Sequence, residues 1–162
     1  GEVRGQGRGE PRPPPRRPAT PAVPDHATGE GLVEFLDLMR TMRERCAWKA
    51  SQSHGSLARF LREESDEVLE AIEEGDPRHL AEELGDLLLQ IYFHAAIAEE
   101  AGEFTMDDVI SGLTEKMRRR NPHVFGPDAE AAWKSGRRYT IEEIEELWQA
   151  AKAAERSPNP GL

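Results

Sequence analysis

The sequence predicts an all-α fold, and three observations support this prediction. Apolar residues recur at intervals of three and four along most of the chain, which is the spacing of a helix with one buried face. Residues that cap helices stand where such helices should begin, as at Asp76-Pro77 and Thr140. No pair of segments alternates apolar and polar residues as adjacent strands do. We therefore expect a bundle of four to five helices.

The first two predicted helices are amphipathic. The first runs from Gly31 to Arg45, and its apolar stripe consists of Leu32, Phe35, Leu36, Met39 and Met42. The periodicity lapses between Cys46 and Gly55, which predicts a loop. Ser56 can cap the second helix, which we expect to end at Glu74 because Gly75 follows it.

The third predicted helix is apolar on almost every side. Asp76 as N-cap and Pro77 at the first helical position predict its start, and Gly102 predicts that it ends near Ala101. From Leu84 to Ala98 few polar residues interrupt it. A helix without a polar face must be covered by other helices. Four or five helices of this size can hardly do so within one subunit, so we expect a helical oligomer.

Two more helices complete the predicted domain, and both ends of the chain lie outside it. Thr105 caps a helix that reaches Arg119 or Arg120, and the capping box Thr140–Glu143 opens a last helix to about Ala154. Residues 1–29 hold seven prolines and five arginines and almost no large apolar side chain, which predicts a disordered tail. We expect one domain over 30–156 and a frayed end over 157–162.

The charge of the chain limits its partners. Its 162 residues include 21 Lys and Arg against 31 Asp and Glu, a net charge of −10. This balance argues against a nucleic-acid partner, because binding to the phosphate backbone needs clustered cations. No run approaches the ~18 apolar residues that span a bilayer, so we expect no membrane partner and a cytoplasmic location. The single cysteine excludes an intrachain disulfide framework.

Acidic residues interrupt the apolar faces of the second and third helices. Glu64 falls within the apolar band of the second helix, and Glu63 and Glu67 are its neighbours on adjacent turns. The third helix carries one polar stripe, at steps of three, four and four residues: Glu83, Asp86, Gln90 and His94. Other acids at such spacing are interpreted as a solvated face, namely Glu70, Glu73, Glu74 and Glu82.

Carboxylates sheltered together need a cation. Without one, their pKa values rise until the groups are neutral. Mg²⁺ prefers carboxylate and water oxygens, and a pair of helices can present them at this spacing. A dinuclear iron site would need a Glu three residues before a His, but Ile91 precedes His94 and Asp76 precedes His79 at that distance. The sequence therefore favours magnesium.

These acids also carry a family resemblance. Two acidic segments are separated by fifteen residues: Glu63–Glu67 and Glu83–Asp86. This pattern resembles the EExxE…ExxD motif of the all-α nucleoside triphosphate pyrophosphohydrolases, and within that superfamily the sequence is most similar to the MazG family. Three further segments are similar to MazG sequences: Ser51–His54, Glu83–Ala95 (ELGDLLLQIYFHA) and Lys116–Phe125 (KMRRRNPHVF). The resemblance covers residues 32–155.

The resemblance implies an enzyme that hydrolyses nucleoside triphosphates to the monophosphate and pyrophosphate with Mg²⁺, or Mn²⁺ in its place. It also implies a four-helix core assembled as a homodimer or a dimer of dimers. The positions that match the family's metal ligands are Glu64, Glu67, Glu83 and Asp86. Glu63 matches a residue that supports the site and helps to orient or deprotonate the attacking water. We expect Glu63, Glu64 and Glu67 to serve catalysis.

Seven residues are candidates for substrate binding: Lys116, Arg119, Arg120, Trp48, His54, Trp148 and Lys152. The cations resemble the family's phosphate contacts, although Lys and Arg at a helix end also complement its dipole. Trp148 and Lys152 match positions near the nucleotide in the family, while a Trp on a terminal helix commonly serves packing. Trp48 can stack on a base or plug a core, and His54 can contact nucleotide or cap a helix.

The sequence leaves alternatives open for the preferred substrate and for the class of function. The segment Cys46-Ala47-Trp48-Lys49 replaces the Cys-Pro-Trp-Asp usual in MazG, which reverses a charge near the expected pocket. A narrower dNTP or phosphoribosyl-ATP pyrophosphatase would share the same acids. A non-catalytic helical module with an acidic interaction face is the third reading, and it would expose Glu64 and Asp86 instead of sheltering them.

Overall fold

The computed structural model describes residues 26–156, and every regular element within that range is a helix. The elements are α1 (His26–Arg45), α2 (Ala47–Ala50), α3 (His54–Glu74), α4 (Pro77–Glu100), α5 (Met106–Arg120), α6 (Pro122–Phe125), α7 (Ala129–Lys134) and α8 (Ile141–Arg156). The predicted all-α class is confirmed. The five long helices correspond to the five predicted ones, whereas the short helices α2, α6 and α7 were not predicted.

The chain divides into two units, residues 1–35 and 36–162, and the groups analysed below belong to the second. The helix α1 begins at His26, earlier than the predicted Gly31, so it includes residues 26–29, which the sequence analysis assigned to the tail. The rest of the predicted tail and the predicted frayed end 157–162 lie outside the described residues.

Most predicted helix starts are confirmed by their caps. The side chain of Asp76 accepts a hydrogen bond from the Arg78 amide at 3.0 Å, and Thr105 forms a capping box at the start of α5. The predicted cap of α3 is wrong. Ser53 is its N-cap, and Ser56 is the third helical residue, whose hydroxyl lies 2.8 Å from the Ser53 amide. Either serine can fill the capping role locally, so the sequence alone does not separate them.

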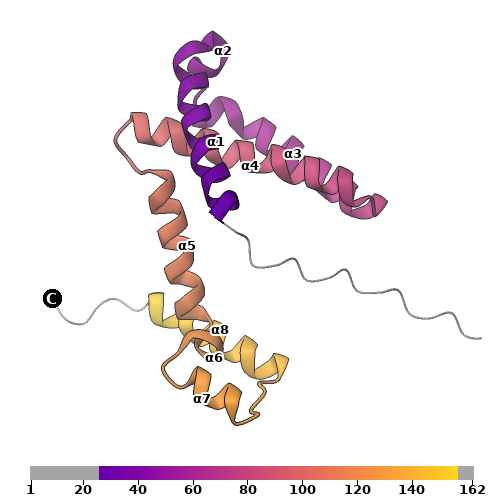
Figure 1. Ribbon diagram of the computed structural model, residues 1–162, viewed down its shortest axis with the longest axis vertical. Helices are drawn as coiled ribbons and strands as arrows, with labels where there is room; N and C mark the ends of the chain where they lie inside the picture. Colours follow the sequence, from indigo (N-terminus) through magenta and orange to yellow (C-terminus); the bar gives the residue numbers. More distant parts are fainter. Residues whose placement is uncertain (1–25, 157–162) are drawn as a thin grey trace, which may run out of the picture. The chain divides into compact units, whose positions relative to one another are not determined.

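The helices α3 and α4 form an antiparallel hairpin and contact each other more extensively than any other pair of helices in the described part of the chain (Figure 1). Its core is closed by Met39 of α1, Leu57 of α3 and Phe93 of α4, which are fully buried. Arg40 donates to Glu99 at 2.9 Å and so ties the C-terminal half of α1 to the end of α4. Burial of each of these large apolar side chains stabilises this end of the hairpin by about 1.5–3 kcal/mol.

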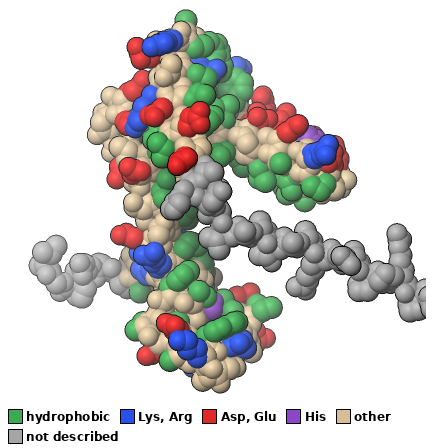
Figure 2. All heavy atoms as spheres, viewed as in Figure 1, with side chains coloured by type: hydrophobic (Ala, Val, Ile, Leu, Met, Phe, Trp, Pro, Cys, Tyr) green, Lys and Arg blue, Asp and Glu red, His purple; other side chains and the backbone are tan. Residues whose placement is uncertain are grey.

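The other part of α4 keeps apolar side chains on its surface. Leu84, Leu88 and Ile91 are 48%, 39% and 41% exposed. Figure 2 shows apolar side chains beside acidic ones along the hairpin on the right of the view. One chain therefore leaves this helix partly uncovered, as the sequence analysis expected.

The C-terminal helices are joined through α5. It contacts α4 at one end and α6 and α8 further along, and α6 contacts α7. Among the described residues, no helix is both long and apolar enough to cross a membrane.

Candidate metal centre

The hairpin turn sets which faces of α3 and α4 meet. Gly75 ends α3 with φ +74°, a left-handed conformation that other residues adopt only at a cost. Asp76 then caps α4 and Pro77 begins it, so the chain reverses within two residues. This tight reversal holds the two helices antiparallel, and residues at similar distances from the turn face each other.

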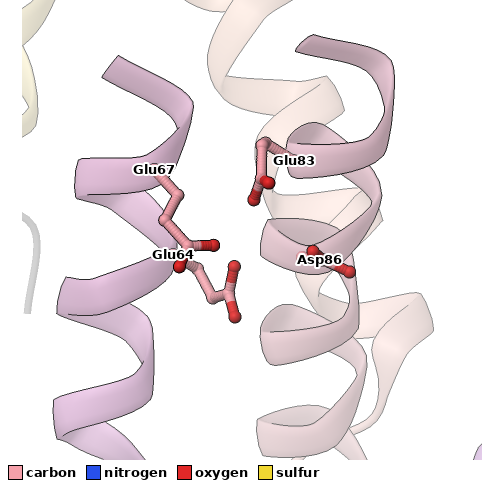
Figure 3. A group of neighbouring side chains, drawn as sticks. All are labelled: Glu64, Glu67, Glu83 and Asp86. Atoms are coloured by element: carbon pink, nitrogen blue, oxygen red, sulfur yellow. The ribbon is translucent and has the colours of Figure 1, made fainter. Parts of the chain in front are cut away.

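Four carboxylates meet between these two helices. Glu64 and Glu67 are one turn apart on α3, and Glu83 and Asp86 are one turn apart on α4. One carboxylate oxygen from each lies within 4.8 Å of the corresponding oxygen of every other. Figure 3 shows the two acids of α3 facing the two acids of α4.

The four acids differ in their exposure to solvent. Glu64 and Glu83 are half-buried, whereas Glu67 and Asp86 are exposed. Asp86 was expected to be sheltered by its apolar neighbours. That expectation is wrong for this chain, because Asp86 lies on the open side of the helix pair.

Burial and mutual repulsion disfavour the charged form of the sheltered acids. Burial, followed by the charges of Glu67 and Asp86, raises the pKa of Glu64 to about 7. The pKa of Glu83 is also raised, first by its hydrogen bond with Glu67 and then by burial. A hydrogen bond from His79 acts in the opposite direction on Glu83. At neutral pH the cluster is thus strained by its own negative charge.

The donor set fits a hard divalent cation. Oε2 of Glu64 and Oε2 of Glu83 are buried and have no hydrogen-bond partner among the described residues. Over the same range no Lys or Arg forms an ion pair with any of the four acids. A buried carboxylate oxygen left unpaired costs free energy that a cation would recover. Four oxygen ligands without nitrogen or sulfur match the preference of Mg²⁺ or Mn²⁺.

A histidine that the sequence analysis did not select supports this cluster. The Nε2 atom of His79 lies 3.2 Å from Glu83 Oε1, and its Nδ1 atom lies 2.6 Å from Glu74 Oε2. The hydrogen bond with Glu74, opposed by desolvation, raises the pKa of His79. His79 precedes Glu83 by one helical turn, so the i, i+4 spacing was the available signal. Its link to Glu74 depends on the hairpin turn.

Glu63 is not part of the cluster. It lies exposed on α3 next to Glu64, so any role in catalysis would be exercised from the edge of the group.

Three of the residues predicted to bind substrate, Arg119, Arg120 and Trp148, lie together at the junction of α5 and α8. Arg119 Nε lies 2.8 Å from Glu155 Oε1, and Arg120 Nη2 lies 2.9 Å from Glu155 Oε2. The Arg120 guanidinium also stacks 5.0 Å from the centre of the Trp148 ring. Hydrogen bonds from Arg120 and then Arg119 lower the pKa of Glu155 to about 2. None of these contacts joins the junction to the four acids.

Lys116 and Lys152 remain outside this ion-paired group. Lys116 is exposed on α5, and Lys152 is half-buried on α8.

The remaining predicted contacts lie near the start of α3. The Nδ1 atoms of His54 and His94 are 2.7 Å apart, and their rings are stacked. His54 is not the cap of α3, because Ser53 holds that position. Trp48 packs edge-on against Phe93 with ring centres 6.4 Å apart, yet half of its surface remains exposed. The predicted plug role of Trp48 therefore has a physical basis, and its free surface leaves room for a second role.

Comparison with known proteins agrees with the geometry. The family model of the MazG nucleotide pyrophosphohydrolase domain matches residues 52–125, which include all four acids. The nucleoside triphosphate pyrophosphohydrolase of Mycobacterium tuberculosis is 41% identical over 138 residues, or 84% of this chain and 40% of the relative. The nucleoside triphosphate pyrophosphohydrolase/pyrophosphatase MazG of Thermotoga maritima is 42% identical over 127 residues, covering 78% and 45%. The chain thus spans less than half the length of these relatives.

A solved structure shares the fold. The crystal structure of a MazG-related protein from Thermotoga maritima matches 75% of this chain and 98% of its own chain, with a TM-score of 0.62 and 26% sequence identity. The sequence match over the acidic cluster and the matching helical architecture agree on the same assignment. The chain carries a domain of the MazG nucleotide pyrophosphohydrolase family.

Proposed function

We propose that this domain hydrolyses nucleoside triphosphates to the nucleoside monophosphate and pyrophosphate, with Mg²⁺ held by Glu64, Glu67, Glu83 and Asp86. The proposal is supported most by one observation, the convergence of these carboxylates with two buried oxygens that lack a partner. A solvated acidic interaction face would leave such oxygens in water. The relatives named for this reaction support the choice of substrate.

The roles of the protein's own groups follow from their positions. When bound, the metal would neutralise phosphate charge and lower the pKa of a water molecule. His79, through Nε2, holds the Glu83 carboxylate in orientation. Glu63 is proposed to accept the proton of the attacking water, since it lies exposed beside the cluster. Lys116 offers an exposed ammonium for the phosphates. Arg119 and Arg120 would bind phosphate only in competition with Glu155.

The proposal is tested by a panel of NTPs and dNTPs incubated with the protein and Mg²⁺, with separate detection of pyrophosphate and orthophosphate. Pyrophosphate release that needs Mg²⁺ supports the proposal. Orthophosphate release, or no turnover with any substrate, contradicts it. A strong preference for dNTPs would assign the narrower alternative.

We also propose that the protein assembles as a homodimer or a dimer of dimers. Leu84, Leu88 and Ile91 on α4, with Leu69 and Ile72 on α3, are exposed in the single chain. Burying each of them stabilises an assembly by about 1–3 kcal/mol. Sedimentation equilibrium of the wild type and of Ile91→Glu tests this. The variant should shift toward monomer, and a monomeric wild type would contradict the proposal.

A further inference from the structure

A pocket that none of the four carboxylates lines lies among α6, α7 and the start of α8. It encloses about 170 Å³. Three rings line it, those of His123, Trp133 and Tyr139, together with the guanidinium-bearing side chains of Arg137 and Arg138. Aliphatic side chains of the three helices close the remaining walls. The volume is below the roughly 300–1,000 Å³ of sites that enclose a drug-sized ligand, so the pocket admits a single ring system and not a whole nucleotide.

The local sequence builds the rim of this pocket. α7 ends at Lys134, and Gly136 continues with φ +87°, which a residue with a Cβ adopts only under strain. The amide of Arg137 then donates to the Ala132 carbonyl at 3.0 Å. This turn returns the chain over α7 and places two consecutive arginines against the aromatic rings.

The arginines keep positive charge that the protein hardly neutralises. The Arg138 guanidinium lies 3.4 Å from the centre of the Trp133 ring and donates to two backbone carbonyls, those of Trp133 and Arg137. No acid among the described residues pairs with Arg138, and Arg137 has only a 3.8 Å contact with Glu143. The Arg137 guanidinium lies 4.3 Å from the centre of the Tyr139 ring, so both arginines are held over aromatic rings. Guanidinium groups positioned in this way are preorganised to bind phosphate oxygens.

The ring of His123 forms part of the pocket wall and packs against Tyr139 with ring centres 5.7 Å apart. Trp133, which lines the same pocket, is 64% exposed and therefore offers a free aromatic face. The pocket thus combines aromatic walls with cations at its rim.

We propose that this pocket binds a nucleoside monophosphate, with the base between the aromatic side chains and the phosphate at Arg137 and Arg138. Stacking of a base on aromatic rings contributes ~1–3 kcal/mol. The sugar spans from the pocket to its rim. The site is separate from the carboxylate cluster and does not depend on the proposed hydrolysis.

Calorimetric titration of the full chain with AMP in EDTA tests the proposal, because removal of divalent cations suppresses binding at the carboxylates. Adenosine and ribose 5-phosphate are titrated as the two halves of the ligand. AMP should bind one per chain, and each half should bind at least ~10-fold more weakly, the factor that corresponds to ~1.4 kcal/mol. If ribose 5-phosphate bound as tightly as AMP, the base would contribute nothing, and the proposed role of the aromatic walls would be wrong.

Variants locate the site. Trp133→Leu and the double variant Arg137→Gln/Arg138→Gln change exposed side chains, and each should weaken AMP binding at least ~10-fold while the circular dichroism spectrum is retained. Lys134→Gln, a neighbouring exposed cation on α7, is the matched control and should leave the affinity unchanged. Wild-type affinity in both pocket variants, loss of binding in Asp86→Asn, or no binding at millimolar AMP would each overturn the proposal.

Discussion

Between α3 and α4, four carboxylates converge, and no Lys or Arg within residues 26–156 pairs with them. At the junction of α5 and α8, by contrast, two arginines pair with one glutamate. The first group raises the pKa of Glu64 to about 7, and the second lowers the pKa of Glu155 to about 2. The same type of side chain is thus destabilised as an anion in one region and stabilised in the other. At the junction of α5 and α8, carboxylate and guanidinium charges balance and stabilise the fold. Between α3 and α4, the carboxylate charges are not balanced by side chains of the described residues, which indicates a site for a cation.

The largest expected effect is on turnover. Asp86→Asn removes one charge from the cluster and should lower Mg²⁺-dependent pyrophosphate release at least ~1,000-fold, because a bound metal supplies several kcal/mol of charge stabilisation and 1.36 kcal/mol is a factor of ten. Steady-state kinetics with saturating Mg²⁺ measures it. Glu82→Gln, an exposed acid on the same helix, is the control and should keep wild-type turnover. Comparable turnover in both variants would remove the distinction between the cluster and an ordinary acidic face.

The local features of the fold were the most predictable from sequence. Asp76-Pro77 and Thr105 mark helix starts because each satisfies free amides by itself. Periodicity also found the five long helices. It could not find α2 or α6, since four residues do not complete enough turns to show a repeat. The choice between Ser53 and Ser56 depended on where the first turn packs, which the local sequence does not specify.

The candidate site was predictable where one helix sufficed. Glu64 with Glu67, and Glu83 with Asp86, share a face through spacing alone. The support that His79 receives from Glu74 was missed because the two residues belong to different helices and meet only across the turn. Pairing of Arg119 and Arg120 with Glu155 was missed for the same reason. Contacts between helices depend on packing angles that periodicity does not contain.

The next effect separates the two regions by the sign of their pH dependence. In EDTA, folded Glu64 holds its proton up to about pH 7, whereas in the unfolded chain it loses it near its usual value of 4.5. The folded state therefore binds more protons in this window, and its stability falls as the pH rises through it. Because Glu64 is partly solvated, the loss should stay below ~1 kcal/mol.

Urea denaturation of the wild type and of Glu64→Gln from pH 4 to 8 measures this loss. The variant should become relatively more stable as the pH rises and then level off above about pH 7. If the free energy of unfolding changed with pH in the same way for both proteins, the inference that charge repulsion destabilises the cluster would be contradicted.

The smallest effect concerns the balanced region. Glu155 has a lowered pKa, so its contribution to stability is present above its usual value of 4.5 and is lost as the pH falls toward 2. Glu155→Gln should therefore lower the melting temperature slightly at pH 7 and not at pH 2. Differential scanning calorimetry at the two pH values measures it. A variant that is more stable than the wild type at pH 7 would show that this junction, too, is strained.

The central claim is that the four acids together hold one divalent cation site, and calorimetric titration of the metal-free protein with Mg²⁺ tests it most directly. Saturable binding should be present in the wild type and in Glu155→Gln, and lost in Glu64→Gln and in Asp86→Asn, with all four proteins equally helical. Wild-type Mg²⁺ affinity in either of the two cluster variants would contradict the account.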